Sequence, residues 1–132
     1  SLRAKALARY GDYATARSHY QECLRYDPEH SECKDGYRVL KAVLKAKDRG
    51  DEALAQGRWD DAVLAFTDGI AADEGNPTWL KETLPKLAKA HWRRGDARSA
   101  EDVARRALQM DDGIGQRQGS PQRSIAITSR KG

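Results

Sequence analysis

The chain has no long apolar run and few of the residues that build catalytic or metal centres. It contains three histidines and two cysteines, and no segment approaches the ~20 apolar residues that a transmembrane helix needs. It has no phosphate-binding glycine loop, no nucleophile elbow and no His-Glu zinc helix. Its first residues, Ser1-Leu2-Arg3, do not resemble a signal peptide. We therefore expect no enzyme, no cofactor and no membrane partner.

Most of the chain also lacks an excess of either charge sign. The net charge is +4, but four of the 24 basic residues lie in residues 113–132, which contain no acidic residue. The first 112 residues are left with 20 basic and 20 acidic side chains. Nucleic-acid binding requires a basic face on the folded part, so we predict no nucleic-acid partner. We interpret residues 113–132 as a basic, flexible tail.

What the chain does contain is one residue pattern that occurs three times. In each copy an alanine follows a glycine after five residues, and two further positions follow at steps of four. The glycines are Gly11, Gly57 and Gly95, so the copies are 46 and 38 residues apart. The later positions are Ala16, Tyr20 and Leu24, then Ala62, Phe66 and Ile70, then Ala100, Ala104 and Leu108.

This pattern predicts a helix-turn-helix unit. Glycine ends the first helix because it adopts the left-handed cap conformation without strain. An acidic residue soon afterwards (Asp12, Asp60 or Asp96) favours the start of the second helix. The alanine permits the two helices to cross closely, and the steps of four predict one buried face on the second helix.

The three copies resemble the tetratricopeptide repeat, whose period is 34 residues. The resemblance covers residues 1–112 and implies an all-α solenoid of about two and a half repeats. Its units would be residues 1–30, 31–74 and 75–112, with a long helix joining the first two. We expect helices over residues 2–10, 13–26, 32–56, 59–71, 78–94 and 97–110.

Three features of these helices are open or unusual. Residues 45–51 are polar all round, so we expect them to stand in water between two packed units, with a break at Gly50 as the alternative. Pro85 either kinks its helix or lies in the first turn of a helix that begins near Thr83. Ser31 is the expected cap of the long helix. Asn76 is the expected cap of the helix over residues 78–94, with Pro77 at the first helical position.

Cys23 and Cys33 lie on two helix ends that a tight turn brings together. The spacing alone leaves a disulfide and two buried thiols equally open. A zinc site that also uses His19 and His30 is a third interpretation, although its spacing matches no common zinc pattern.

Residues 22–34, followed by Tyr37-Arg38 and a lysine-rich helix, resemble the lumenal co-chaperones of the endoplasmic reticulum that carry tetratricopeptide repeats and a J-domain. The resemblance implies a Cys23–Cys33 disulfide, an oxidising compartment and binding of unfolded or partner polypeptides. It also implies work with a BiP-type heat-shock chaperone through a J-domain. This chain has no His-Pro-Asp motif, so that J-domain is absent from it.

The main alternative is a cytoplasmic adaptor that grips the acidic tail of a heat-shock chaperone. Its carboxylate clamp needs lysines and asparagines on successive first helices, and here those helices carry Lys5, Lys47, Lys86 and Lys89 but no asparagine. A purely structural connector between other repeats is a further alternative.

Stacked first helices line the concave face of a repeat array, where ligands bind. Register predicts eight groove residues: Leu44, Lys47, Asp51, Leu54, Glu82, Lys89, Trp92 and Arg93. We predict that Trp92 is solvent-reachable, whereas Trp59 and His91 have structural roles. Dimerisation through the truncated first repeat is an additional expectation.

Overall fold

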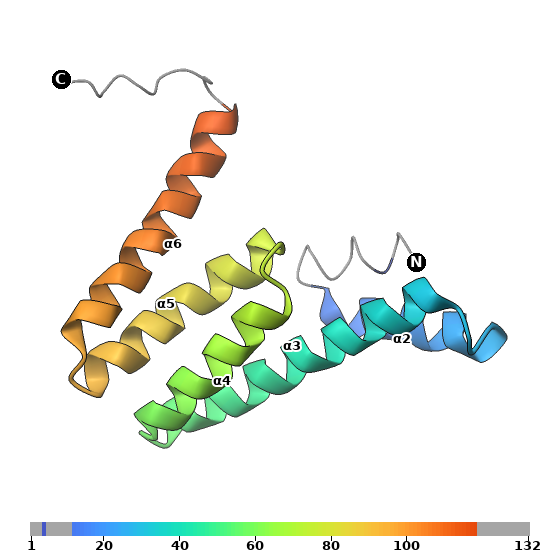
Figure 1. Cartoon of the computed structure of the whole chain (residues 1–132), viewed down its shortest axis with the longest axis horizontal. Coiled ribbons are helices and arrows are strands. Elements are labelled where there is room, and N and C mark those ends of the chain that lie inside the picture. The colour runs from blue at the N-terminus through green and yellow to red at the C-terminus, as the bar shows by residue number, and fades with distance from the viewer. Residues whose placement is uncertain (1–3, 5–11, 119–132) are drawn as a thin grey trace.

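The computed structural model describes residue 4 and residues 12–118, with side chains described as far as Met110. This part of the chain folds into five α-helices without strands (Figure 1). They are α2 (Tyr13–Tyr26), α3 (Ser31–Ala55), α4 (Trp59–Ala72), α5 (Pro77–Arg93) and α6 (Ala97–Gln118). The predicted all-α repeat array is confirmed. Apart from Ala4, the helix expected over residues 2–10 lies outside the described residues, as do its terminal Gly11 and residues 119–132 of the tail. Within that described part, no helix combines the length and apolarity needed to cross a bilayer.

Two glycines end helices as the pattern predicts. Gly57 and Gly95 have φ angles of 73° and 93°, in the left-handed region that glycine adopts most readily. Each turn closes by a backbone hydrogen bond from the next residue, 2.8 Å from Arg58 N to Ala53 O and 2.9 Å from Asp96 N to His91 O. The chain therefore reverses direction where the glycines occur.

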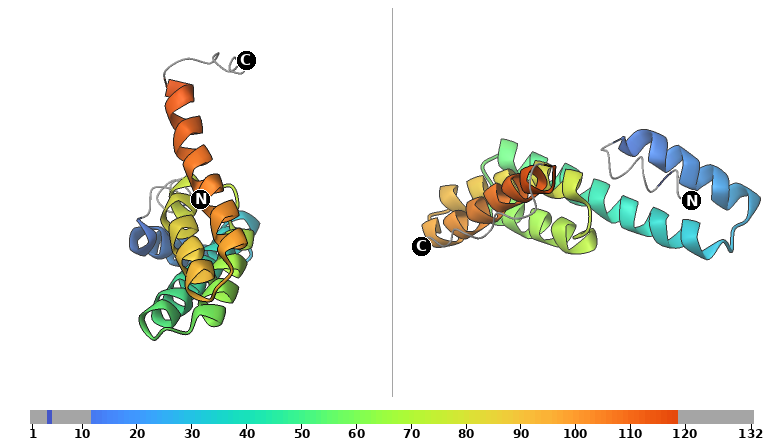
Figure 2. Two further views of the ribbon diagram at one scale, coloured as in Figure 1. Left: turned by 90° about the vertical axis from the view of Figure 1, so that its left-hand side faces the viewer. Right: turned by 90° about the horizontal axis from the view of Figure 1, so that it is seen from above.

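The long helix α3 belongs to two packed units. Its N-terminal half packs on α2 around the buried Tyr20, Cys33 and Leu40, and its C-terminal half packs on α4 and contributes Ala53 to the second core. Figure 2 shows α2 beside one end of α3, with α4, α5 and α6 gathered at its other end. Trp79 connects the units because its fully buried ring packs with Val43 and Ala46 of α3.

The expectation that residues 45–51 stand in water is wrong. Ala46 is 6% exposed and Gly50 is buried, and α3 is continuous through both. A methyl group added at Gly50 would overlap the Phe66 ring of α4. The small residues of this polar stretch lie on one face, so α4 approaches the α3 backbone there, and the alternative break at Gly50 does not occur.

Two predicted helix starts also need correction. His30, not Ser31, caps α3, because its Nδ1 accepts a hydrogen bond from Cys33 N at 3.2 Å. Helix α5 begins at Pro77 and runs through Pro85, so a start near Thr83 is wrong. The predicted cap is confirmed, since the Asn76 side-chain oxygen accepts from Trp79 N at 3.2 Å.

The predicted buried face of α6 is only partly right. Ala100 is 6% exposed, but Ala104 is exposed and Leu108 is 64% exposed. Helix α6 instead packs on the second core through a different stripe, made of Val103, Ala107 and Met110. It also continues to Gln118, beyond the expected end at residue 110. Consequently α6 has two apolar faces, and one of them lacks a cover among the described residues.

Candidate functional site

The eight predicted groove residues fall into separate groups rather than one surface. Three of them form a charged cluster between α3 and α5. Lys47 Nζ hydrogen-bonds Glu82 and lies 3.5 Å from Asp51 Oδ2. Lys86 Nζ completes the cluster at 2.8 Å from Asp51 Oδ1 and 3.6 Å from Glu82 Oε2. On each helix the two partners are four residues apart, so they share a face.

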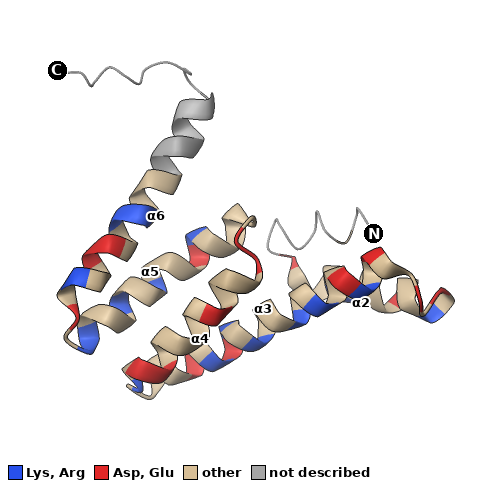
Figure 3. Ribbon diagram, in the orientation of Figure 1, with Lys and Arg blue, Asp and Glu red and all other residues tan. Residues whose placement is uncertain are grey.

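Each lysine in this cluster is already paired with carboxylates. The hydrogen bond that Lys47 donates to Glu82 raises the pKa of Lys47 against the opposing effect of burial, and Asp51 adds to the rise. Paired lysines leave little free positive charge for the acidic tail of a chaperone, which disfavours a carboxylate clamp. Figure 3 shows acidic and basic residues interspersed along the described helices.

The two predicted leucines contribute packing. Leu44 packs against the core around Tyr20, and Leu54 packs against the core around Phe66. Both are only partly exposed. Leu44 and Leu54 therefore act mainly as edge residues of the two cores.

Lys89 and Trp92 line a shallow groove of about 580 Å³ between α5 and α6. The Trp92 side chain is 64% exposed, as predicted. The other lining residues are Pro85 and Ala88 of α5, with Ala97, Ala100, Glu101 and Ala104 of α6. Alanines keep this groove open, because a methyl side chain leaves room beside the indole.

Arg93 belongs to a different surface. Its guanidinium lies over the Trp59 ring of α4, 5.6 Å from the ring centroid, within the range of a cation–π contact. Trp59 is accordingly half-buried. His91 is buried beside the turn between α5 and α6, which agrees with the structural role predicted for it.

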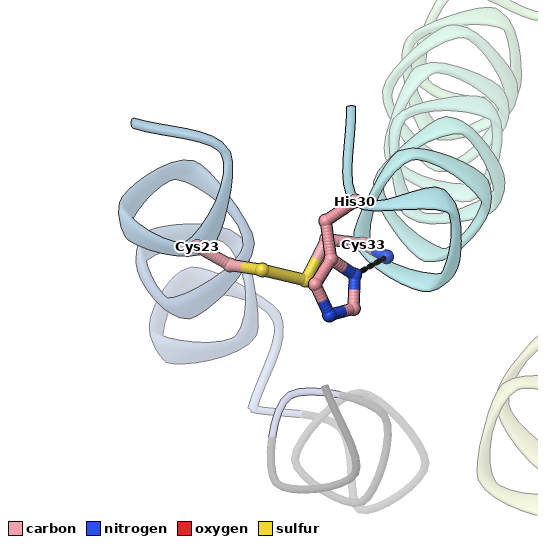
Figure 4. Close-up of side chains that lie close together, drawn as sticks. All are labelled: Cys23, His30 and Cys33. Carbon is pink, nitrogen blue, oxygen red and sulfur yellow. Dashed lines mark hydrogen bonds between the residues drawn. A yellow bond between two sulfur atoms is a disulfide. The ribbon is translucent and has the colours of Figure 1, made fainter. Parts of the chain in front are cut away.

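Cys23 and Cys33 form a disulfide in the structure, with Cα atoms 6.5 Å apart (Figure 4). The bond links the end of α2 to the first turn of α3. His30 lies beside it, and the ligand atoms of these three residues are within 4.8 Å of one another. The two sulfurs are bonded to each other and His30 Nδ1 caps α3, so all three groups are engaged in this arrangement. His19, proposed for the zinc alternative, is not part of this group.

Comparison with known proteins places the chain among repeat proteins. The tetratricopeptide repeat family matches residues 47–83, which run from the second half of α3 into α5. The DnaJ protein P58IPK homolog B of Oryza sativa and the P58IPK homolog of Arabidopsis thaliana are each 30% identical over 110 residues, 83% of this chain and 23% of theirs. The DnaJ homolog subfamily C member 7 homolog of Schizosaccharomyces pombe is 30% identical over 86 residues, 65% of this chain and 17% of its own.

The chain thus spans about a fifth of the length of these curated relatives. No solved structure matches it significantly. Sequence pattern, helix arrangement and relatives agree on the repeat architecture. The chain therefore belongs to the tetratricopeptide repeat proteins and, among them, resembles the P58IPK-type DnaJ co-chaperones.

Proposed function

We propose that this chain is a non-catalytic module that binds unfolded or partner polypeptides as part of a J-domain co-chaperone. The observation that carries the proposal is the exposed Trp92 in the apolar groove between α5 and α6. Exposed apolar surface beside an aromatic anchor is typical of protein-binding sites. Leu108 extends this surface along α6, since it follows Ala100 and Ala104 at helical spacing.

The remaining parts of the proposal concern context. A heat-shock chaperone of the BiP type would receive the bound polypeptide through a J-domain outside this chain. The Cys23–Cys33 geometry supports an oxidising compartment, the lumen of the endoplasmic reticulum, because disulfides persist there. A cytoplasmic adaptor is the alternative, and the pairing of Lys47 and Lys86 with acids argues against its carboxylate clamp.

An aggregation assay tests the binding proposal. We expect the chain to delay aggregation of a chemically unfolded protein at about stoichiometric amounts, and Trp92→Ala to lose most of that delay. Tyr26→Ala is the matched control, because Tyr26 is 83% exposed on α2, outside the groove. Equal delay by wild type and Trp92→Ala would reject the groove as the binding surface.

A structural connector is the second candidate function. The small residues Ala100 and Ala104 form a stripe on α6 that resembles the buried stripes of α2 and α4. A neighbouring helix packed on that stripe would cover the groove. In that case the chain would not delay aggregation at any tested ratio.

A further inference from the structure

A second recess lies at the junction of the two packed units, away from Trp92. It is a cleft of about 310 Å³ between α2, the N-terminal half of α3 and the turn that connects α4 to α5. Its floor is apolar and is formed by Val39, Leu40 and Val43 of α3. Tyr13 and Tyr20 of α2 supply aromatic walls. The volume is at the small end of the range for ligand pockets, which suits one or two side chains.

Every charged side chain that lines this cleft in the described part of the chain is acidic. Glu32 and Asp35 belong to the first turns of α3, and Asp73 follows α4. Asp73 Oδ2 accepts a hydrogen bond from Asn76 at 3.1 Å, whereas Glu32 and Asp35 are exposed at the rim. Asp35 forms an ion pair with the exposed Arg38 at 3.3 Å, and such pairs at the surface are weak.

The pKa values of both tyrosines are raised by burial and by nearby carboxylates. Burial is the main reason that the pKa of Tyr13 is raised to about 12. The negative charges of Glu82 and Asp73 also raise this pKa, and the positive charge of Lys47 lowers it. The pKa of Tyr20 is also raised, by burial first and then by Glu32 and Asp73. The buried Tyr13 hydroxyl has no hydrogen-bond partner among the residues that the structure describes.

Apolar floor, aromatic walls and acidic rim together match one kind of side chain. Lysine and arginine bury an aliphatic stem while the charged end stays at the surface. In this cleft the stem would lie on Val39 and Leu40, and the cationic end would reach Glu32 and Asp35. An acidic segment would instead be repelled by three carboxylates.

We propose that the cleft between α2, α3 and the α4–α5 turn binds a lysine or arginine side chain of an extended partner polypeptide, flanked by aliphatic residues. The proposal rests on the proposed function, because it names the class of segment that the module takes. It uses a surface other than the Trp92 groove, so the two can fail separately.

Fluorescence anisotropy of short labelled peptides tests this selectivity. The probe is a Gly-Ser-flanked Leu-Lys-Leu-Lys-Leu peptide, and its comparator has norleucine in place of both lysines. We expect the lysine peptide to bind at least roughly fivefold more tightly at low ionic strength, since exposed charge pairs contribute modestly. Added salt should reduce the difference, because it screens the rim.

The variant Glu32→Gln/Asp35→Asn should remove that preference. The matched control is Asp48→Asn/Glu52→Gln, which changes the net charge equally at exposed positions of α3 outside the cleft. Trp92→Ala should leave the lysine preference intact. Thermal unfolding confirms that each variant is folded before binding is compared.

Several outcomes would overturn the inference. Equal affinity of wild type for both peptides, or no binding of either, rejects the cationic selectivity. Equal effects of the two double variants would show that net charge, not the cleft, attracts the peptide. A monomer–dimer equilibrium that only the cleft variant abolishes would assign the cleft to a second copy of the chain. The two proposals can also be separated. If Trp92→Ala loses the aggregation delay but wild type shows no preference for the lysine peptide, the proposed function stands and the cleft proposal fails.

Discussion

His91 lies in the last turn of α5, where its imidazole is 11% exposed. Burial lowers its pKa below 6.5, and Arg94 lowers it further against the opposing effect of Asp96. The unfolded chain therefore binds a proton at a higher pH than the folded chain does. His91 reduces stability as the pH falls below 6.5 toward its folded-state pKa, and has no such effect above 6.5.

Urea unfolding at about pH 7.5 and about pH 5.5 checks this sign. We expect wild type to lose more unfolding free energy between the two values than His91→Gln does. His19→Gln on α2 controls for removal of a histidine as such. A loss in His91→Gln as large as in wild type would contradict the role of His91.

Cys23 and Cys33 give a second prediction at the residue scale. Alkylation of the denatured, unreduced protein, made under oxidising conditions, should leave both cysteines unmodified, with a mass two hydrogens short. The two cysteines are separated by 10 positions in the sequence. Reduction of a disulfide that closes a loop of this size should lower the free energy of unfolding by about 2–3 kcal/mol. Two alkylated cysteines would remove the support for a lumenal protein and favour a cytoplasmic adaptor.

Helix α3 shows how packing reverses an expectation from propensity. Glycine inside a helix is less favourable than alanine by about 1 kcal/mol, so Gly50→Ala should stabilise an isolated helix. In this fold the added methyl group would meet the Phe66 ring. We therefore expect Gly50→Ala to destabilise the protein by about 1–3 kcal/mol, as overpacked cores do.

Chemical denaturation measures this effect, and Phe66→Leu provides the test of mechanism. Leucine is smaller than phenylalanine and has no ring. Gly50→Ala should therefore lower the free energy of unfolding by less in the Phe66→Leu background than in wild type. Gly75→Ala is a matched control, because no atom lies within 4 Å of its added methyl group. A stabilising Gly50→Ala would contradict the close approach of α3 and α4.

The helix ends were predictable because their signals are local. Gly57, Gly95 and the Asn76-Pro77 pair each act within one turn, and the structure uses all of them. The packing of residues 45–51 was not predictable in this way, since the neighbours of Ala46 and Gly50 come from α4 and α5. The capping by His30 was missed because a serine, a common cap residue, stands next to it.

The candidate site was predictable to a similar extent. Repeat register placed Lys47, Asp51 and Glu82 among the groove residues but did not predict that they form one cluster, and the spacing of four from Glu82 could have added Lys86. The exposure of Leu108 could not be predicted, because the repeat pattern describes an α6 face that a neighbouring helix covers. Trp92 owes its exposure to the same uncovered side of the array.

At the scale of the whole molecule, two packed units share α3. One recess lies at their junction and another lies on the second unit. The cleft at the junction has an acidic rim, whereas the groove between α5 and α6 presents Trp92 and alanines. A polypeptide could use either surface alone, and one long enough could use both. The charged cluster around Lys47 links the C-terminal half of α3 to α5 within the second unit.

The indole signals of the three tryptophans test the central proposal most directly. Trp79 is fully buried and its Nε1 donates to Gly69 O at 2.9 Å, Trp59 is covered by Arg93, and Trp92 is exposed. In a titration with an unfolded polypeptide followed by proton–nitrogen NMR, we expect the Trp92 signal to shift or broaden at the lowest ratios while that of Trp79 stays in place. Binding that leaves the Trp92 signal unchanged would contradict the proposed groove.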